Sequence, residues 1–396
     1  MLTALLAVVL AQPAAAPDPA EKARFDKAAD YSAEHAGRAV LIQRAGKTVY
    51  ERYDNGGSAA TPQPLASGTK SFTGVAAMFA VQDKLFTLDE QVAGTITEWS
   101  GDPKKSQITV RHLLTLSSGL QADGDGVKAR NRDLNNGRRE GLEALAKSAR
   151  NDWFKDAVNA PMTGTAGGQF EYGGNHFYVF GEFLERKLKA SELPEKTAWD
   201  YYTARIFKPI GLDVARIGRD VAGHPNLPGG CSLTAREWVK FGQFVLDGGA
   251  WAAGDGTKTQ LLAPDLLAQC FVPSEENPFY GLTFWLRRSG QEATNPMRPD
   301  AGTGGPARER IAARLRSDHF GQQVQPVTGP DGKPIEVRMA AGLGGQKLYI
   351  LPQYGIVVVR FARIGDPAGR TFDDKPFLAD ILNIAKEEGP GDKPTK

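Results

Sequence analysis

The order of strand-like and helix-like segments constrains the fold of this chain more than any other feature. Two β-prone runs, at residues 38–43 and 47–53, flank an Ala45–Gly46 turn near the N-terminus. Helical segments joined by Gly/Pro loops then follow to about Leu246, and strand-like runs return only in the last third. A sheet must therefore bring together pieces from both ends of the chain, with a helical domain inserted between them.

Periodicity and turn residues predict the individual elements. Helices are predicted at residues 21–36, from Ser67 onward, and at 110–116, 177–188, 235–246 and 376–386, and strands at 280–286, 347–351 and 355–361. We expect one domain over residues 21–390, with a sheet subdomain formed by 21–66 and 247–390 and a helical subdomain formed by 67–246. Residues 287–334 are polar and rich in Gly, Pro and Arg, which predicts a solvated insertion, with a lid over the site as the alternative.

Composition and the motifs that are missing narrow the range of functions. The 396 residues carry a net charge of +2, with basic residues dispersed among acidic ones, so nucleic acid and acidic membranes are not expected as partners. No nucleophile elbow, zinc-binding helix, phosphate loop or dinucleotide fingerprint is present. The five histidines lie far apart in the sequence, and none stands at ligand spacing with another. We therefore expect no metal and no cofactor.

The N-terminus has the features of an export signal. An apolar run over residues 2–10 is followed by small residues over 11–16, so we predict that residues 1–16 are a signal peptide of a bacterial protein that is periplasmic or secreted. The run lacks a preceding Lys or Arg, and a buried N-terminal helix is the alternative. No other segment suits an integral membrane span. Cys231 and Cys270 are then either a disulfide or two buried thiols, and both alternatives stay open.

Ser67 and Lys70 form a Ser-x-x-Lys pattern at the start of a predicted amphipathic helix. Residues three apart on a helix share a face, so the Lys70 amine can reach the Ser67 hydroxyl. A serine hydroxyl is a poor nucleophile until a base takes its proton, and a lysine becomes that base only when its pKa falls well below about 10.4. The pair alone is weak evidence, because many such sequences are ordinary helix caps.

Two further sequences strengthen this interpretation. Residues 170–175 (Phe-Glu-Tyr-Gly-Gly-Asn) place Tyr172 on a loop before a helix, where its hydroxyl can relay a proton between Ser67, Lys70 and a leaving group. Residues 341–346 (Ala-Gly-Leu-Gly-Gly-Gln) open the last hairpin. Glycines let the backbone approach a ligand closely, so amides of this turn can complete an oxyanion hole with the Ser67 amide.

Taken in this order, the three motifs resemble the serine β-lactamase and penicillin-binding-protein superfamily. The similarity is to its class C β-lactamase-like branch, which includes carboxylesterases, D-amino-acid peptidases and 6-aminohexanoate-dimer hydrolase. Residues 66–73 (Ala-Ser-Gly-Thr-Lys-Ser-Phe-Thr) look like the nucleophile helix of the family, and residues 85–89, 108–120 and 229–242 are similar to its other blocks. The resemblance runs from about Arg38 to Ala385, interrupted by the polar insertion.

The resemblance implies a fold and a set of roles. The fold is α/β (α+β), with a β-lactamase-like antiparallel sheet flanked by helices, an inserted all-α domain and the site between them. Ser67 is the nucleophile of an acyl-enzyme mechanism, and Lys70 and Tyr172 share the proton transfers. The amides of Ser67 and Leu343 form the oxyanion hole. Substrate-binding positions are Gly174, Asn175, Gly342, Gly344 and Gly345.

Two departures from the family pattern bear on the substrate. Many relatives carry Tyr-x-Asn at the second motif, whereas here the third position is Gly174 and Asn175 is displaced by one. The usual Lys or His of the third motif is replaced by Gly342, which removes a cation that binds a substrate carboxylate. Both changes resemble the esterase and amide-hydrolase branch more than true β-lactamases.

Three functions follow, of which the first is favoured. The chain is predicted to be a monomeric hydrolase of a small ester, amide or peptide, with no carboxylate required on the substrate. The second is a D,D-peptidase or β-lactamase that acts on cell-wall peptides or antibiotics. The third is a non-catalytic protein that binds or senses a cell-wall fragment, which the intact Ser67, Lys70 and Tyr172 disfavour.

Overall fold

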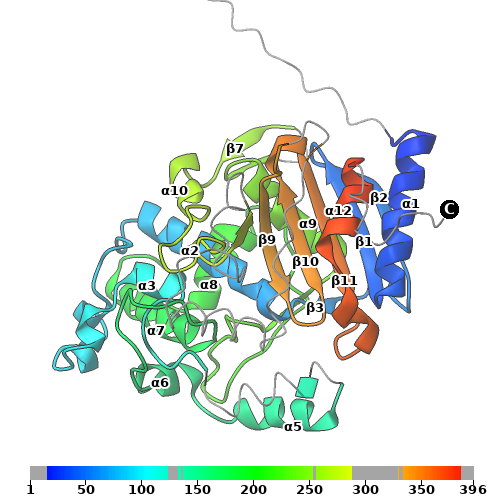
Figure 1. The fold of residues 1–396 in the computed structure, drawn as a ribbon. Coiled ribbons are helices and arrows are strands. Elements are labelled where there is room, and N and C mark those ends of the chain that lie inside the picture. Colours follow the sequence, from blue (N-terminus) through cyan, green and yellow to red (C-terminus); the bar gives the residue numbers. More distant parts are fainter. Residues whose placement is uncertain are drawn as a thin grey trace, which may run out of the picture.

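An antiparallel sheet joins the two ends of the chain, as expected from the order of the segments. The structure, a computed structural model, describes residues 16–123, 133–134, 137–252, 256–287, 329 and 333–384. Within these residues, six strands pair in the order β2–β1–β11–β10–β9–β8 (Figure 1). The N-terminal β1 pairs with the C-terminal β11, with Val40 opposite Arg360 and Arg44 opposite Ile356. The predicted meeting of the two ends is therefore confirmed.

The strands of this sheet are β1 (Gly37–Arg44), β2 (Lys47–Tyr53), β8 (Trp285–Arg287), β9 (Val337–Gly342), β10 (Gln346–Leu351) and β11 (Ile356–Ala362). Smaller sheets are formed by β3 (Gln63–Pro64), β4 (Arg216–Ile217) and β5 (Cys231–Leu233), and by β6 (Ala250–Ala252) and β7 (Lys258–Gln260). Every residue of β10 and β11 is buried. Their apolar runs at 348–351 and 356–359 are typical of strands covered on both faces.

Helices cover the sheet on both sides. On one face lie α1 (Pro19–Glu34) and α12 (Asp374–Leu382), whose Phe25 and Phe377 belong to the same hydrophobic cluster as Tyr349 of β10 (Figure 1). On the other face α9 (Ala235–Leu246) packs against β1, β10 and β11. The predicted helical subdomain, 67–246, includes this helix, but in the structure α9 packs on the sheet. Periodicity shows that a helix has an apolar face, not which layer that face meets.

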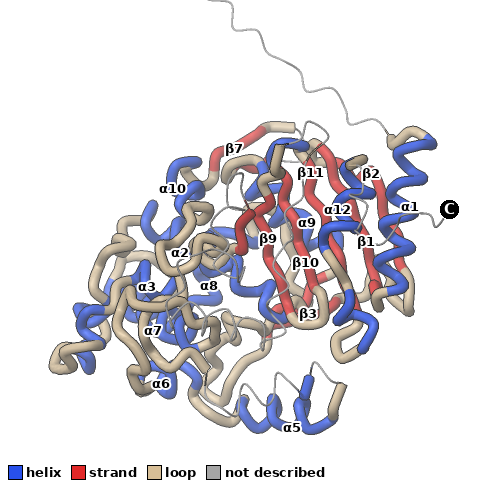
Figure 2. The backbone as a smooth tube through the Cα atoms, viewed as in Figure 1, coloured by secondary structure: helices blue, strands red, loops and turns tan. Residues whose placement is uncertain are grey.

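The remaining helices gather beside the sheet rather than on it (Figure 2). They are α2 (Lys70–Gln82), α3 (Val110–Leu114), α5 (Arg139–Ser148), α6 (Trp153–Val158), α7 (Asn175–Ala190), α8 (Ala198–Tyr202) and α10 (Pro264–Gln269), with a π-helical turn at Thr203–Phe207 after α8. Short 3₁₀ turns occur at Ala66–Thr69, Val92–Gly94, Thr97–Trp99, Lys105–Gln107, Pro352–Tyr354 and Pro367–Thr371. An antiparallel sheet flanked by helices, with a mainly helical part beside it, matches the fold class expected from the sequence.

Helix α2 runs through the centre of the molecule and is buried on nearly all sides. Phe72 packs edge-on against Phe207 and Phe241, with ring centroids 5.1 and 4.6 Å away. Complete burial of one such ring stabilises the fold by about 2–3 kcal/mol. The helix that carries Lys70 is therefore held by tertiary packing rather than by its own helix propensity.

Several element boundaries differ from those predicted. Helix α2 begins at Lys70, and Ser67 lies in the preceding 3₁₀ turn rather than in the helix. The predicted strand at 280–286 is regular only from Trp285, because Thr283 has a positive φ of 69° and its amide bonds the carbonyl of Leu114. Strand β9 has no counterpart among the predicted strands. Its last two residues belong to the Gly-rich sequence 341–346, which predicts a turn.

Two predicted segments lie mostly outside the residues that the structure describes. The predicted signal peptide at 1–16 lies outside the described residues except for Ala16, and the insertion at 287–334 lies outside them except for Arg287, Gly329, Lys333 and Pro334. Cys231 and Cys270 are both free and buried, so the disulfide alternative is wrong. No helix within the described residues is long and apolar enough to cross a membrane.

A buried Ser–His pair connects α7 to the loop that follows α3 and to the loop that precedes α7. His176 is 1% exposed, and its Nε2 lies 2.9 Å from the carbonyl oxygen of Glu171. A carbonyl only accepts hydrogen bonds, so Nε2 carries the proton and Nδ1 accepts one from the Ser118 hydroxyl, 2.9 Å away. Burial lowers the pKa of His176 to about 4, with the charge of Lys70 adding to the shift and the Glu171 bond opposing it. His176 is therefore a neutral residue that anchors the loop next to Tyr172.

We predict that the protein loses stability as the pH falls from about 6.5 to about 4. The folded pKa of His176 lies below that of an unfolded histidine, so the unfolded state binds more protons across this range and is favoured by acid. The contribution amounts to about 3 kcal/mol. Urea unfolding at a series of pH values measures it. His176→Gln, which does not titrate, should flatten the pH dependence, and an unchanged slope in that variant contradicts the assignment.

Candidate active site

Ser67 lies on a tight turn between strand β3 and helix α2. The residue before it, Ala66, has a φ of 47°, in the left-handed region that non-glycine residues rarely adopt. Thr69 holds this turn, because its hydroxyl donates to the Ala66 carbonyl at 2.8 Å and accepts from the Cys231 amide at 3.2 Å. Tertiary contacts thus maintain a strained backbone directly before the predicted nucleophile.

Lys70 is the first residue of α2 and is only 5% exposed. Its Nζ lies 3.0 Å from the Ser67 Oγ and donates to the Pro228 carbonyl at 2.8 Å. The same atom stands over the rings of Tyr172 and Phe177, 4.9 and 5.3 Å from their centroids. The sequence predicts that Ser67 and Lys70 share a face of an α-helix, whereas in the structure a 3₁₀ turn brings the two side chains together. In a 3₁₀ turn, side chains three residues apart lie almost directly above one another.

Tyr172 completes the cluster from the loop before α7. Its side chain hydrogen-bonds with Ser67 and Trp285. Burial raises the pKa of Tyr172, the bonds to Ser67 and Trp285 oppose the shift, and the charge of Asp123 adds to it. Tyr172 therefore keeps its proton at neutral pH. The structure brings Ser67, Lys70 and Tyr172 together, while their catalytic roles remain predictions.

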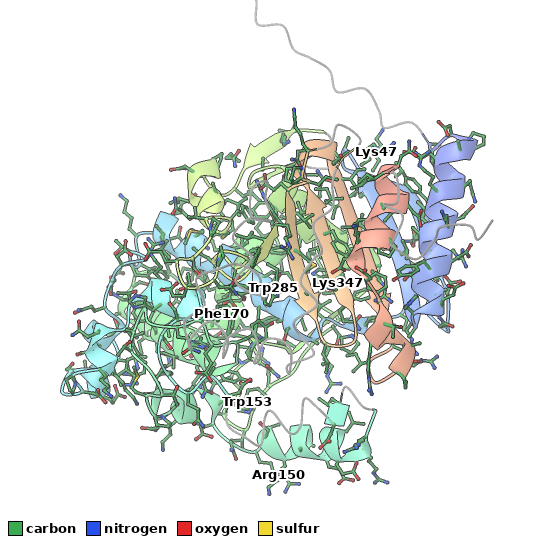
Figure 3. All side chains as sticks on the ribbon, in the orientation of Figure 1. Lys47, Arg150, Trp153, Phe170, Trp285 and Lys347 are labelled. Carbon is green, nitrogen blue, oxygen red and sulfur yellow. The ribbon has the colours of Figure 1, made fainter. Side chains whose placement is uncertain are left out.

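Aromatic side chains from its own loop and from residues 280–285 lie around Tyr172. Trp285 stacks on it with 5.6 Å between ring centroids, and Tyr280 meets Trp285 edge-on at 5.0 Å. Phe170 lies 5.3 Å from Tyr280, and Figure 3 shows Phe170 and Trp285 near each other where the sheet meets the helices. This aromatic group was not predicted, because the sequence around Tyr280 and Trp285 indicates only a strand.

The predicted oxyanion turn at the end of β9 lies against the Ser67 turn. A Cβ placed on Gly342 would come within 2.0 Å of the Leu65 carbonyl oxygen and 3.1 Å of the Gly68 nitrogen. No side chain therefore fits at position 342 on this backbone, so the cation that the family pattern places there has no room. Leu343 is the next residue after Gly342, so its amide lies beside the Ser67 turn.

Two predicted substrate-binding residues are engaged by the protein itself. The Gly174 amide donates to the Asp123 carboxylate at 2.7 Å, and the Asn175 side-chain nitrogen donates to the Gln121 carbonyl at 2.7 Å. Gly344 and Gly345 have φ values of 78° and 81°, which explains why both are glycine without reference to a substrate. Substrate binding by these residues stays a prediction.

A second cluster of ionisable groups lies away from these residues. Ligand atoms of Asp152, Asp220 and His224 lie within 4.8 Å of one another, an arrangement that sequence spacing did not suggest. The Asp220 carboxylate, however, already accepts bonds from the amides of Trp153, Ala222 and His224 at 2.8–3.0 Å. These bonds tie α6 to the 220–224 loop, and they account for the cluster as a structural contact.

Among the solved structures with a similar fold, three are named for an activity or a protein family. One is a D-stereospecific amidohydrolase from Streptomyces sp., at 16% identity and a TM-score of 0.60, covering 93% of this chain and 100% of the other. Another is EstCE1, a hydrolase with promiscuous acyltransferase activity, at 16% identity and 0.58, covering 92% and 98%. A third is an octameric penicillin-binding protein homologue from Pyrococcus abyssi, at 16% identity and 0.57, covering 92% and 77%.

These similarities support the fold alone, because all three identities are low. No curated protein matches the chain. The model of one protein family, described as Beta-lactamase, matches residues 23–383, which is most of the sequence and includes both sheet halves and the Ser67 turn. The chain therefore belongs to the beta-lactamase family.

Proposed function

We propose that this protein hydrolyses a small ester or amide through an acyl-enzyme formed on Ser67. The observation that carries the proposal is the contact of 3.0 Å between the Lys70 amine and the Ser67 hydroxyl, in a buried site that also contains the Tyr172 hydroxyl. A nucleophile, a base and a second proton carrier in mutual contact form the arrangement that covalent catalysis by serine requires.

The first step is attack of the Ser67 oxygen on the substrate carbonyl carbon. Neutral Lys70 accepts the Ser67 proton, since an ammonium has no lone pair. Its hydrogen bond to the Pro228 carbonyl holds one N–H away from Ser67, so the lone pair of the neutral amine can face the hydroxyl. The carbonyl oxygen becomes an anion, which the amides of Ser67 and Leu343 stabilise.

The second step expels the alcohol or amine and leaves the acyl group on Ser67. Tyr172 holds its proton because burial raises its pKa, so it donates to the leaving group and is reprotonated from Lys70. Water then attacks the acyl carbon, its proton passes to the same pair, and the acid departs with Ser67 restored. Each proton taken from a nucleophile is thus returned to a leaving group.

The substrate that best suits this site is uncharged at the acyl side. Position 342 has no space for a carboxylate-binding cation, and the Asn175 amide is occupied by Gln121. Trp285, the partly exposed member of the aromatic group around Tyr172, favours an apolar acyl or alcohol portion. The names of two structural neighbours, an amidohydrolase and a hydrolase with acyltransferase activity, also describe acyl transfer. Export to the periplasm or medium remains part of the proposal.

Purified protein should hydrolyse p-nitrophenyl butyrate with a burst of p-nitrophenol, because p-nitrophenol leaves when Ser67 is acylated and, with this activated ester, deacylation is expected to be the slower step. Ser67→Ala should lower kcat at least about 1,000-fold, since it removes the group that forms the covalent bond. Stopped-flow absorbance measures both, and a fluorophosphonate adduct located by mass spectrometry identifies the serine. Ser58→Ala, at an exposed serine nearby, serves as the control. Full activity in Ser67→Ala rules out this nucleophile.

Tyr172→Phe should lower kcat for the same ester about 100-fold or more, because it keeps the ring over Lys70 and removes the hydroxyl that carries the proton. Tyr178→Phe is the matched control, since its hydroxyl bonds Asn226 instead. Steady-state kinetics at neutral pH measure both variants. Equal activity in the two would remove Tyr172 from the mechanism.

Hydrolysis of the cephalosporin nitrocefin should be slow, with kcat/KM at least about 100-fold below that for p-nitrophenyl butyrate. The reason is that position 342 lacks the cation that would bind the β-lactam carboxylate, and a charge-assisted contact of this kind contributes about 1.5–3 kcal/mol. Absorbance assays with both substrates on one preparation make the comparison. Rapid nitrocefin turnover would favour a β-lactamase or D,D-peptidase over the esterase or amidase.

A further inference from the structure

The turn at residues 342–345 sets the direction of the Leu343 amide. The Gly345 amide donates to the Gly342 carbonyl at 3.2 Å, so that carbonyl points into the turn. No cis peptide bond occurs in the described chain, and across a trans peptide the C=O and the next N–H point in opposite directions. The Leu343 N–H therefore points out of the turn, and its direction depends on how firmly the turn is held.

Gln346 holds this turn from within. Its side chain is completely buried, and its carboxamide pairs with both backbone groups of Ala362: Nε2 donates to the Ala362 carbonyl at 2.8 Å, and Oε1 accepts from the Ala362 amide at 3.2 Å. The carboxamide thus takes the place of a peptide group where the β9–β10 turn leaves the ladder. Nε2 also lies 3.3 Å from the Leu343 carbonyl and 3.5 Å from that of Gly344.

Arg360 holds the other end of the same turn. It is completely buried on β11, and its Nη1 donates to the Gly345 carbonyl at 2.8 Å. The guanidinium is itself fixed by the Ser32 hydroxyl at 2.9 Å and the His35 carbonyl at 2.6 Å. Three consecutive carbonyls, from Leu343 to Gly345, therefore accept hydrogen bonds from two buried side chains that make no contact with Ser67.

We propose that Gln346 is a positioning residue for the reaction: its carboxamide fixes the turn so that the Leu343 amide faces the Ser67 oxyanion before substrate binds. This inference rests on the proposed function. Preorganised donors stabilise the transition state because no reorientation is needed as charge develops. If the turn can change its orientation, the protein still binds the ester but the Leu343 amide stabilises the oxyanion less well. Loss of the Gln346 hydrogen bonds should therefore lower the rate of acylation rather than the affinity for substrate.

The test compares Gln346→Met with the wild-type protein. Methionine keeps the length of the side chain and removes all of its hydrogen bonds. The acylation burst with p-nitrophenyl butyrate should slow about 10- to 100-fold while KM changes less than about threefold. The affinity for phenylboronic acid, which forms a tetrahedral adduct with a serine, should fall by a similar factor. Gln346→Glu, which keeps the acceptor and loses the N–H donors, should show the same pattern.

Tyr349→Phe is the matched control, because Tyr349 is a buried polar residue on the same strand and bonds Asp374 rather than the turn. It should lose stability yet keep the wild-type burst rate and boronate affinity. If folded Gln346→Met and Gln346→Glu keep wild-type acylation and boronate affinity, or if Tyr349→Phe loses as much, the inference is overturned. A wild-type protein that neither hydrolyses the ester nor forms a fluorophosphonate adduct at Ser67 contradicts the proposed function instead, so the two failures are distinguishable.

Discussion

The close contact between Gly342 and the carbonyl of Leu65 is the constraint on which the site depends. Leu65 precedes the Ser67 turn, and Gly342 ends a strand of the sheet, so this contact joins the helical part of the molecule to the sheet at one point. Any side chain at position 342 would separate the two. On the sheet side, β9 and β10 both contact the 3₁₀ turn at Ala66–Thr69, which holds Ser67.

Buried polar groups stabilise the sheet side of this contact. Lys347 pairs with Asp374 at 3.2 Å, Tyr349 donates to the same carboxylate, and Arg360 bonds backbone carbonyls of α1 and the glycine turn. A buried charge is costly unless it is paired and hydrogen-bonded. Here each of these charged groups has several partners, so the network fixes the position of β10 and β11 relative to α1 and α12. Arg360 alone in this network also bonds the glycine turn, so it connects the turn beside Ser67 to Ser32 of α1 and to His35 at the end of that helix.

Local patterns were enough to predict much of this arrangement. Alternating β-prone runs located β1 and β2, the apolar stripe at 235–246 located α9, and the spacing of Ser67 and Lys70 indicated a contact that the structure contains. What could not be predicted depends on contacts between distant segments. Phe170, Tyr280 and Trp285 meet only through folding, the Asn175 amide is engaged by a residue that precedes it by more than fifty positions, and the lack of space at Gly342 comes from Leu65. No window of sequence holds both members of such pairs.

The positive φ of Ala66 makes the Ser67 turn depend on distant parts of the chain. An isolated chain does not favour this backbone conformation, which is kept by Thr69, by Cys231 and by the packing of the turn against β9. The turn that brings Ser67 to Lys70 therefore depends on contacts with Cys231 and with β9, which lie more than 160 residues later in the sequence. The geometry of the Ser67 turn is thus a property of the whole fold and not of its own short sequence.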